Sequence, residues 1–236
     1  MRTPPREPAL LSSVPEFLEK WPWYRALTPE LRALTLDTAI ERTADPGEYI
    51  ALAGQPSAHW YGLIRGILQM YVVGADGSET TLYCQREGEW GGEGSLLKRE
   101  MRRYDLRALT QAHLCMVPAA TFETLRQSSI EFNHFLCDIM NARMGEFVGM
   151  LAASRLRGPE MQVARALLML ADDSSSDAQE FSIPQHELAL ISGLSRQRVN
   201  MALSAFRRLG LVRGEAHKGP LVVDVPRLRR YVVAED

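Results

Sequence analysis

The segment from Gln185 to about Leu209 constrains the fold of this chain more than any other part of the sequence. It contains two apolar-periodic stretches, QHELALIS and SRQRVNMALSAFRRL, on either side of Gly193, which can adopt the left-handed conformation of a tight interhelical turn. Ser195 is suited to cap the second stretch as a helix. Ala189 lies four residues before the glycine and is small enough to let two helices approach closely. The segment therefore predicts a helix-turn-helix.

The second helix of this motif is predicted to bury one face and to expose the other. The residues expected on the buried face are Val199, Ala202, Leu203, Phe206 and Leu209. The residue types that hydrogen-bond base edges and phosphates gather near its N-terminus, and the candidates are Ser195, Arg196, Gln197, Arg198, Asn200 and Met201. The next stretch, LVRGEAHKGPLVV, predicts a hairpin wing in which Lys218 either contacts the phosphate backbone or lies in a plain exposed turn.

Charge is distributed unevenly along the chain, although the formal net charge is only −2. Residues 181–230 contain nine Lys or Arg and three Asp or Glu, a net charge of +6, which leaves −8 for the rest of the chain. A basic C-terminal block on an acidic body is typical of a protein that presents one end to a polyanion, although such a run can also be a solvated face. Together with the helix-turn-helix, it indicates binding to double-stranded DNA.

Short apolar runs punctuated by glycine mark the region from about residue 42 to residue 117, and Asp76-Gly77 is a strong hairpin-turn signal. Short strands at nearly regular spacing predict an antiparallel sandwich or roll without a parallel β-α-β rhythm. Before this region, the sequence predicts a short helical segment over roughly Pro15–Arg25 and a helix that Thr28 caps. The apolar positions expected on the capped helix are Leu31, Leu34, Leu36 and Ile40.

A long amphipathic helix is predicted within a helical region that begins near Thr121. Its apolar residues keep three- and four-residue spacing, at Phe132, Leu136, Ile139, Met140, Phe147, Leu151 and Leu156. A stripe of roughly 28 residues favours pairing with a second copy in a symmetric dimer over packing along the chain's own β domain. Gly158-Pro159 ends the stripe. We therefore expect a sensor domain over residues 15–120, a dimerisation helix over 121–157 and a DNA-binding domain over 158–236.

The order of these parts resembles the cyclic-AMP receptor / fumarate-nitrate regulator (Crp/Fnr) family from about Phe17 to Val233. The resemblance implies an α+β fold with an N-terminal cyclic-nucleotide-binding-like antiparallel β-roll, a long dimerisation helix and a C-terminal winged helix-turn-helix. It implies a homodimeric regulator that binds a near-palindromic operator and contacts RNA polymerase. Arg196 falls where many members place a guanine-reading arginine. Gln197 and Met201 stand where a glutamate and a later arginine are common, which predicts a different operator.

The family's phosphate cassette is matched by the stretch GEWGGEGSLLKREMRRYDLRALT. The candidate effector-binding residues in it are Gly92, Glu93, Gly94, Ser95, Arg102 and Arg103. Backbone amides at a helix start and an arginine suit a cyclic phosphate, and a carboxylate suits a ribose hydroxyl. The hydroxyl residue after the arginine is missing, and Phe147 stands where the cyclic-AMP receptor offers a hydrogen bond to adenine.

These two departures from the receptor's pattern leave two readings of the cassette open. The roll binds a nucleotide-type or other anionic effector different from cyclic AMP, or it binds none and only supports dimerisation. In the second reading Arg102, Arg103 and Glu93 form structural ion pairs. No cofactor is specified by either reading.

An enzyme or a scaffold is the alternative class. A cupin-type metalloenzyme needs clustered histidines, whereas the five histidines are scattered, and no P-loop or G-x-S-x-G elbow occurs. We therefore expect no catalytic or metal-binding residues. No apolar run approaches the roughly 18 residues of a membrane helix. The three cysteines are far apart and form no C-x-x-C pair, which favours reduced thiols and a cytoplasmic protein.

Overall fold

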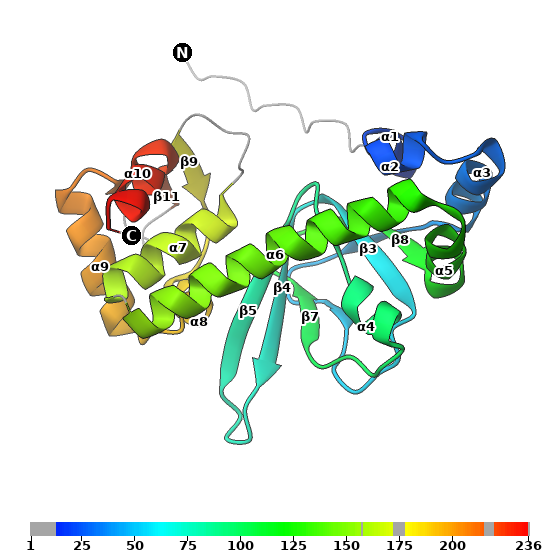
Figure 1. Ribbon diagram of the computed structural model, residues 1–236. Coiled ribbons are helices and arrows are strands. Elements are labelled where there is room, and N and C mark those ends of the chain that lie inside the picture. The colour runs from blue at the N-terminus through cyan, green and yellow to red at the C-terminus, as the bar shows by residue number, and fades with distance from the viewer. Residues whose placement is uncertain (1–12, 157, 172–177, 215–219, 236) are drawn as a thin grey trace, which may run out of the picture. The chain divides into compact units, whose positions relative to one another are not determined.

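The computed structural model describes residues 13–156, 158–171, 178–214 and 220–235 (Figure 1). Contacts divide the chain into two compact units. The first unit comprises Met1–Leu68, Gln85–Arg103 and Arg107–Ile139, and the second comprises Gln69–Cys84, Tyr104–Leu106 and Met140–Asp236.

Three helices precede the first strand in the part of the chain that the structure describes: α1 (Val14–Glu19), α2 (Pro22–Arg25) and α3 (Pro29–Thr38). The predicted segment over Pro15–Arg25 is thus two helices, since Pro22 opens the second. Thr28 caps α3 as expected, and its side chain accepts a hydrogen bond from the Leu31 amide. The expected apolar face of α3 is wrong, because Thr35 is its buried residue while Leu34, Leu36 and Ile40 are at least 36% exposed.

Eight strands form two four-stranded sheets, which confirms the predicted antiparallel roll. One sheet has the order β1 (Ile40–Ala44), β8 (Ala112–Pro118), β3 (His59–Arg65) and β6 (Trp90–Gly91), with antiparallel neighbours. The other has the order β2 (Tyr49–Ala51), β7 (Asp105–Ala108), β4 (Ile67–Val73) and β5 (Glu79–Arg86). Asp76 and Gly77 form the β4–β5 turn as predicted, and the Asp76 carboxylate accepts hydrogen bonds from the amide and hydroxyl of Ser78.

The helical region predicted from Thr121 is two helices, α5 (Ala119–Ser128) and α6 (Ile130–Leu156). Ser129 separates them in an extended conformation, and its hydroxyl accepts a hydrogen bond from the Phe132 amide. Figure 1 shows α6 as one continuous helix after this break.

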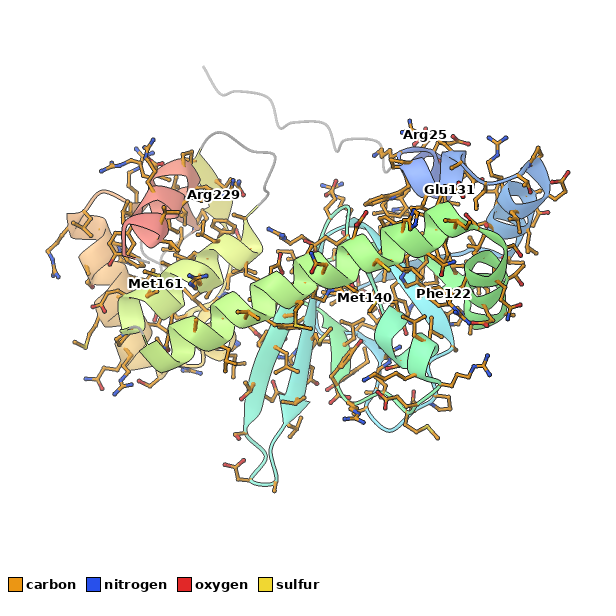
Figure 2. The ribbon with its side chains drawn as sticks, in the orientation of Figure 1. Arg25, Phe122, Glu131, Met140, Met161 and Arg229 are labelled. Carbon is orange, nitrogen blue, oxygen red and sulfur yellow. The ribbon has the colours of Figure 1, made fainter. Side chains whose placement is uncertain are left out.

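The apolar stripe of α6 changes character along its length. Phe132 and Leu136 are 0% and 3% exposed and belong to an aromatic core with residues of α1, α2 and β3. Farther along, the apolar side chains at Met140, Met144, Val148 and Leu151 are 44–62% exposed. Figure 2 labels Met140 near the middle of the helix. The second half of α6 therefore presents an apolar surface.

The C-terminal part of the second unit contains three short strands and four helices in the described residues. In chain order these are α7 (Pro159–Leu170), β9 (Ala178–Phe181), α8 (Gln185–Ser192), α9 (Arg196–Arg208), β10 (Val212–Arg213), β11 (Leu221–Asp224) and α10 (Val225–Glu235). The strands form a sheet in the order β10-β11-β9. Pairing of β10 with β11 agrees with the predicted wing, whose Lys218 lies outside the described residues.

Candidate functional site

The turn between α8 and α9 has the local structure that the sequence predicts. Gly193 has φ +67°, and its amide donates to carbonyls at the end of α8. No atom lies within 4 Å of the position that a Cβ would take there, so the conformation rather than the available space favours glycine. The Ser195 hydroxyl then accepts a hydrogen bond from the Arg198 amide at 3.4 Å. These two residues set the direction in which α9 leaves the turn.

The inner face of α9 is completely buried. Val199, Ala202, Leu203 and Phe206 are all 0% exposed, and the Phe206 ring packs edge-on against Tyr231 of α10 with centroids 5.6 Å apart. Leu209, which we expected on this face, is 51% exposed because it follows the last helical residue. Packing behind the helix therefore holds the opposite face in place.

The outer face of α9 is exposed over its whole length. The sequence-predicted residues Arg196, Gln197, Arg198, Asn200 and Met201 are all exposed, and Met201 is 64% exposed. An open hollow beside this face is also lined by Ser204 and Arg208. Sequence reasoning omitted these two residues, although they continue the four-residue spacing from Asn200. The face combines hydrogen-bonding groups with positive charge, the combination that reads DNA grooves.

Part of the basic C-terminal block has a structural role. The Arg207 guanidinium donates to the Gly214 carbonyl at 2.8 Å. Arg227 of α10, the helix on which Figure 2 labels Arg229, donates to the carbonyls of Leu209 and Gly210 at 3.1 and 3.3 Å. These bonds hold the chain that follows α9. The charge of this block therefore overstates the number of side chains available for phosphate contacts.

The predicted cassette follows β6 and contains the short helix α4 (Glu93–Lys98). Glu93, Ser95 and Arg102 are 4%, 6% and 3% exposed, whereas Gly94 faces solvent. Gly92 has φ +92°, a left-handed conformation that favours glycine at the start of α4. Burial of both a carboxylate and a guanidinium within one short segment is unusual, and it marks the interior of the roll as a polar site.

Two hydrogen-bond partners of Arg102 lie in a distant part of the sequence. Its Nη2 donates to the Ser57 hydroxyl at 2.6 Å and to the Tyr61 hydroxyl at 2.8 Å. The guanidinium also lies over the Tyr61 ring, 5.2 Å from its centroid. Burial raises the pKa of Tyr61, and nearby Arg102 opposes this shift. Sequence reasoning missed both Ser57 and Tyr61, because no local spacing connects them with the cassette.

The other two candidate effector residues are Arg103 and Phe147. The Arg103 side chain is 76% exposed and pairs with Glu100 at 3.0 Å, so Arg103 fits the ion-pair reading and not that of an interior ligand. Phe147 belongs to the second unit, where its ring packs edge-on against Tyr83 at a centroid distance of 6.0 Å. The described structure thus brings Gly92 and Arg102 together around Tyr61, and leaves Arg103 on the surface.

Within the described ranges, no group of three or more His, Cys, Asp or Glu side chains could hold a metal ion. None of the helices in the same ranges has the length and apolar character needed to cross a membrane. The cysteines form no disulfide, and Cys84 and Cys115 are buried while Cys137 is exposed.

Comparison with known proteins identifies both halves of the chain. A family model for the cyclic nucleotide-binding domain matches residues 41–129, and one for the Crp-like helix-turn-helix domain matches residues 162–231. The Cyclic AMP receptor protein of Thermus thermophilus is 28% identical over 204 residues, which cover 86% of this chain and 92% of that protein. The cAMP-activated global transcriptional regulator Vfr of Pseudomonas aeruginosa is 26% identical over 198 residues, which cover 78% of this chain and 91% of that protein.

Solved structures share the fold at lower identity. A transcriptional regulator of the Crp/Fnr family from Eubacterium rectale superposes with a TM-score of 0.71 and 18% identity, covering 91% of this chain and 99% of that one. The c-di-GMP responsive global regulator of Xanthomonas campestris superposes with a TM-score of 0.64 and 21% identity, covering 84% and 99%.

Proposed function

This chain is a DNA-binding transcription regulator of the Crp/Fnr family, and we propose that it reads a near-palindromic operator through the outer face of α9. The observation that supports this reading is the contrast between the two faces of that helix. Four apolar side chains are fully buried behind it, while the polar side chains at its N-terminal end are exposed. A rigidly packed helix with an exposed basic start fits the major groove.

Individual contacts follow from the chemistry of the exposed side chains. Arg196, the first residue of α9, suits a bidentate contact with guanine O6 and N7. Gln197 suits adenine, and the apolar Met201 suits a thymine methyl group. Three further side chains are available to contact phosphates or neighbouring bases: Ser195, Arg198 and Asn200. In the wing, Lys218 is available to contact the phosphate backbone of the DNA.

A homodimer would present two such helices. We assign the dimer contact to the second half of α6, where four apolar side chains remain exposed. Two-fold symmetry would place the recognition helices in successive major grooves about 34 Å apart. In this scheme residues 15–120 form the sensor, residues 121–157 the dimerisation helix and residues 158–236 the DNA-binding domain. The regulator acts in the cytoplasm and contacts RNA polymerase.

The interior of the roll is the proposed effector site. Gly92, Glu93, Ser95 and Arg102 combine a buried carboxylate, a hydroxyl and a guanidinium, which suits an anionic ligand of the nucleotide type. The relatives' names include cyclic AMP and c-di-GMP, so the shared fold accommodates more than one such ligand. The apolar Phe147 argues against cyclic AMP as this protein's effector.

The DNA-reading role is tested by selecting an operator from random duplexes and measuring affinity by fluorescence anisotropy. We expect Arg196→Ala to weaken operator binding by about 1–3 kcal/mol and to relax base choice at one position. Arg25→Ala, an exposed arginine on α2 labelled in Figure 2, is the matched control and leaves affinity unchanged. Equal losses by Arg196→Ala on operator and on random DNA would contradict the assignment. Affinity should also fall steeply with salt.

A further inference from the structure

The Tyr61 side chain contacts both ends of the cassette. Its hydroxyl accepts a hydrogen bond from Arg102 at 2.8 Å. At the other end, a Cβ placed on Gly92 would lie only 2.8 and 2.9 Å from two carbons of the Tyr61 ring. One phenol therefore extends from the residue that opens α4 to the buried guanidinium. These are the same two points between which an anionic effector would bind.

In this arrangement Nη2 of Arg102 has two acceptors that are hydroxyl groups and not an anion. An arginine only donates hydrogen bonds, so the hydroxyls of Ser57 and Tyr61 act here as acceptors. Ring stacking adds a cation–π contact at 5.2 Å. The backbone of Arg102 is also fixed, since its amide donates to the Gln55 carbonyl and its carbonyl accepts from the Gly54 amide. The segment with Ser57 and the end of the cassette are thus held together.

The strand that carries Tyr61 is held firmly on both sides of this residue. The preceding residue, Trp60, stacks on Trp90 with centroids 3.8 Å apart, and the two are 0% and 1% exposed. At the following residue, Gly62, a Cβ would lie 2.5 Å from the Phe17 ring of α1. Tyr61 also pairs with Gly91 in the β3–β6 register. Because the strand is held on both sides, the backbone of Tyr61 is fixed, and its ring is held between Gly92 and Arg102.

We propose that Tyr61, assisted by Ser57, is a built-in occupant of the cassette and determines which ligands can enter it. Its ring fills the space between Gly92 and Arg102, and its hydroxyl takes the place of a phosphate oxygen on the arginine. Cyclic nucleotides are therefore excluded from the wild-type roll, and removal of the ring opens the site to them. This inference depends on the proposed effector site and is independent of the proposed DNA-reading face.

The test is isothermal titration calorimetry of the full-length protein with cyclic AMP and cyclic GMP. We expect no binding to the wild type or to Tyr61→Phe, which keeps the ring. Tyr61→Ala should bind at least one nucleotide, with a Kd at least tenfold below the highest nucleotide concentration at which the wild type shows no binding. Adding Arg102→Met to Tyr61→Ala should abolish that binding. Tryptophan fluorescence provides a second readout, because Trp60 and Trp90 flank the cassette.

The matched control is Tyr24→Ala, which removes a similarly buried phenol, 4% exposed, from the N-terminal core. It should lower stability without creating a nucleotide site. If Tyr61→Ala shows no cooperative melting, Tyr61→Leu replaces it with the same expectation, since a leucine reaches less far toward Arg102.

Three outcomes would overturn the inference: a folded Tyr61→Ala or Tyr61→Leu that binds neither nucleotide, equal binding by Tyr24→Ala, or a wild type that binds as tightly as Tyr61→Ala. If that wild-type binding also requires Arg102, the proposed effector site stands while the role of Tyr61 fails. Operator affinity, measured separately, tests the DNA-reading face.

Discussion

Arg196 at the start of α9 and Arg102 in the roll carry the same guanidinium group in opposite surroundings. Arg196 is exposed on the first turn of a helix whose other face is buried. Arg102 is 3% exposed and donates to two hydroxyl groups. An exposed arginine keeps its charge for a polyanion that arrives from solution. A buried arginine such as Arg102 already donates hydrogen bonds to groups within the fold, so its first contribution is to stability.

The largest effect on stability is expected from a substitution in the buried face of α9, the helix that Arg196 begins. Phe206→Ala removes a ring that is 0% exposed, and we expect a loss of about 3–5 kcal/mol in the stability of the C-terminal helices, measured by denaturant unfolding. DNA binding should weaken with it, because α9 loses its support. Met201→Ala, on the exposed face of the same helix, is the control and should leave stability unchanged. An equal loss of stability in Phe206→Ala and Met201→Ala would mean that the buried and exposed faces of α9 do not differ in their contribution to stability.

The two regions also use glycine for different reasons. Gly193→Ala adds only a strained left-handed residue, since nothing lies within 4 Å, and should cost about 1–2 kcal/mol. Gly92→Ala adds the same strain and also forces the Tyr61 ring to move, so overpacking of about 1–3 kcal/mol comes on top. Thermal melting of both variants compares them. Equal losses would show that the Tyr61 ring is not held against Gly92.

Replacing the two arginines tests the opening comparison directly. Arg102→Met leaves the buried Tyr61 hydroxyl and the half-buried Ser57 hydroxyl without this donor, and we expect a stability loss of about 1–3 kcal/mol. Arg196→Ala should not change the melting temperature, although it weakens operator binding. Differential scanning calorimetry of both variants decides this. A destabilised Arg196→Ala would remove the distinction between a reading residue and a structural one.

The smallest effect is expected from a surface charge cluster on α5. Hydrogen bonds from Arg126, followed by Gln127, lower the pKa of Glu123 to about 2. Because the folded-state pKa lies below the usual value, the stabilisation is complete above that value and is lost as pH falls toward 2. Melting temperatures between pH 6 and pH 2 should therefore fall slightly more for the wild type than for Glu123→Gln. A steeper fall in the melting temperature of Glu123→Gln would contradict the prediction that ionised Glu123 stabilises the fold.

Much of the reading helix could be predicted because its determinants are local. A turn glycine, a capping serine and apolar spacing all act within a few residues, so the start of α9 and four of its five expected buried residues agree with the structure. The expected burial of Leu209 and the expectation of one helical region from Thr121 were wrong, because helix ends depend on what packs beyond them. The surface-exposed leucines of α3 were wrong for a related reason: periodicity locates a face without identifying what covers it.

The cassette shows the limit of local reasoning most clearly. Adjacent arginines at positions 102 and 103 are equivalent in the sequence, yet one is buried and the other is 76% exposed. Both residues lie before β7 (Asp105–Ala108), outside any strand, and only the packing of this segment against distant residues determines which side chain turns inward. By itself, the amino-acid sequence determined a helix-turn-helix with Gly193 and Ser195 at its turn, because those preferences are local. Only the tertiary structure placed Ser57 and Tyr61 on Arg102, because contacts between distant segments arise from packing.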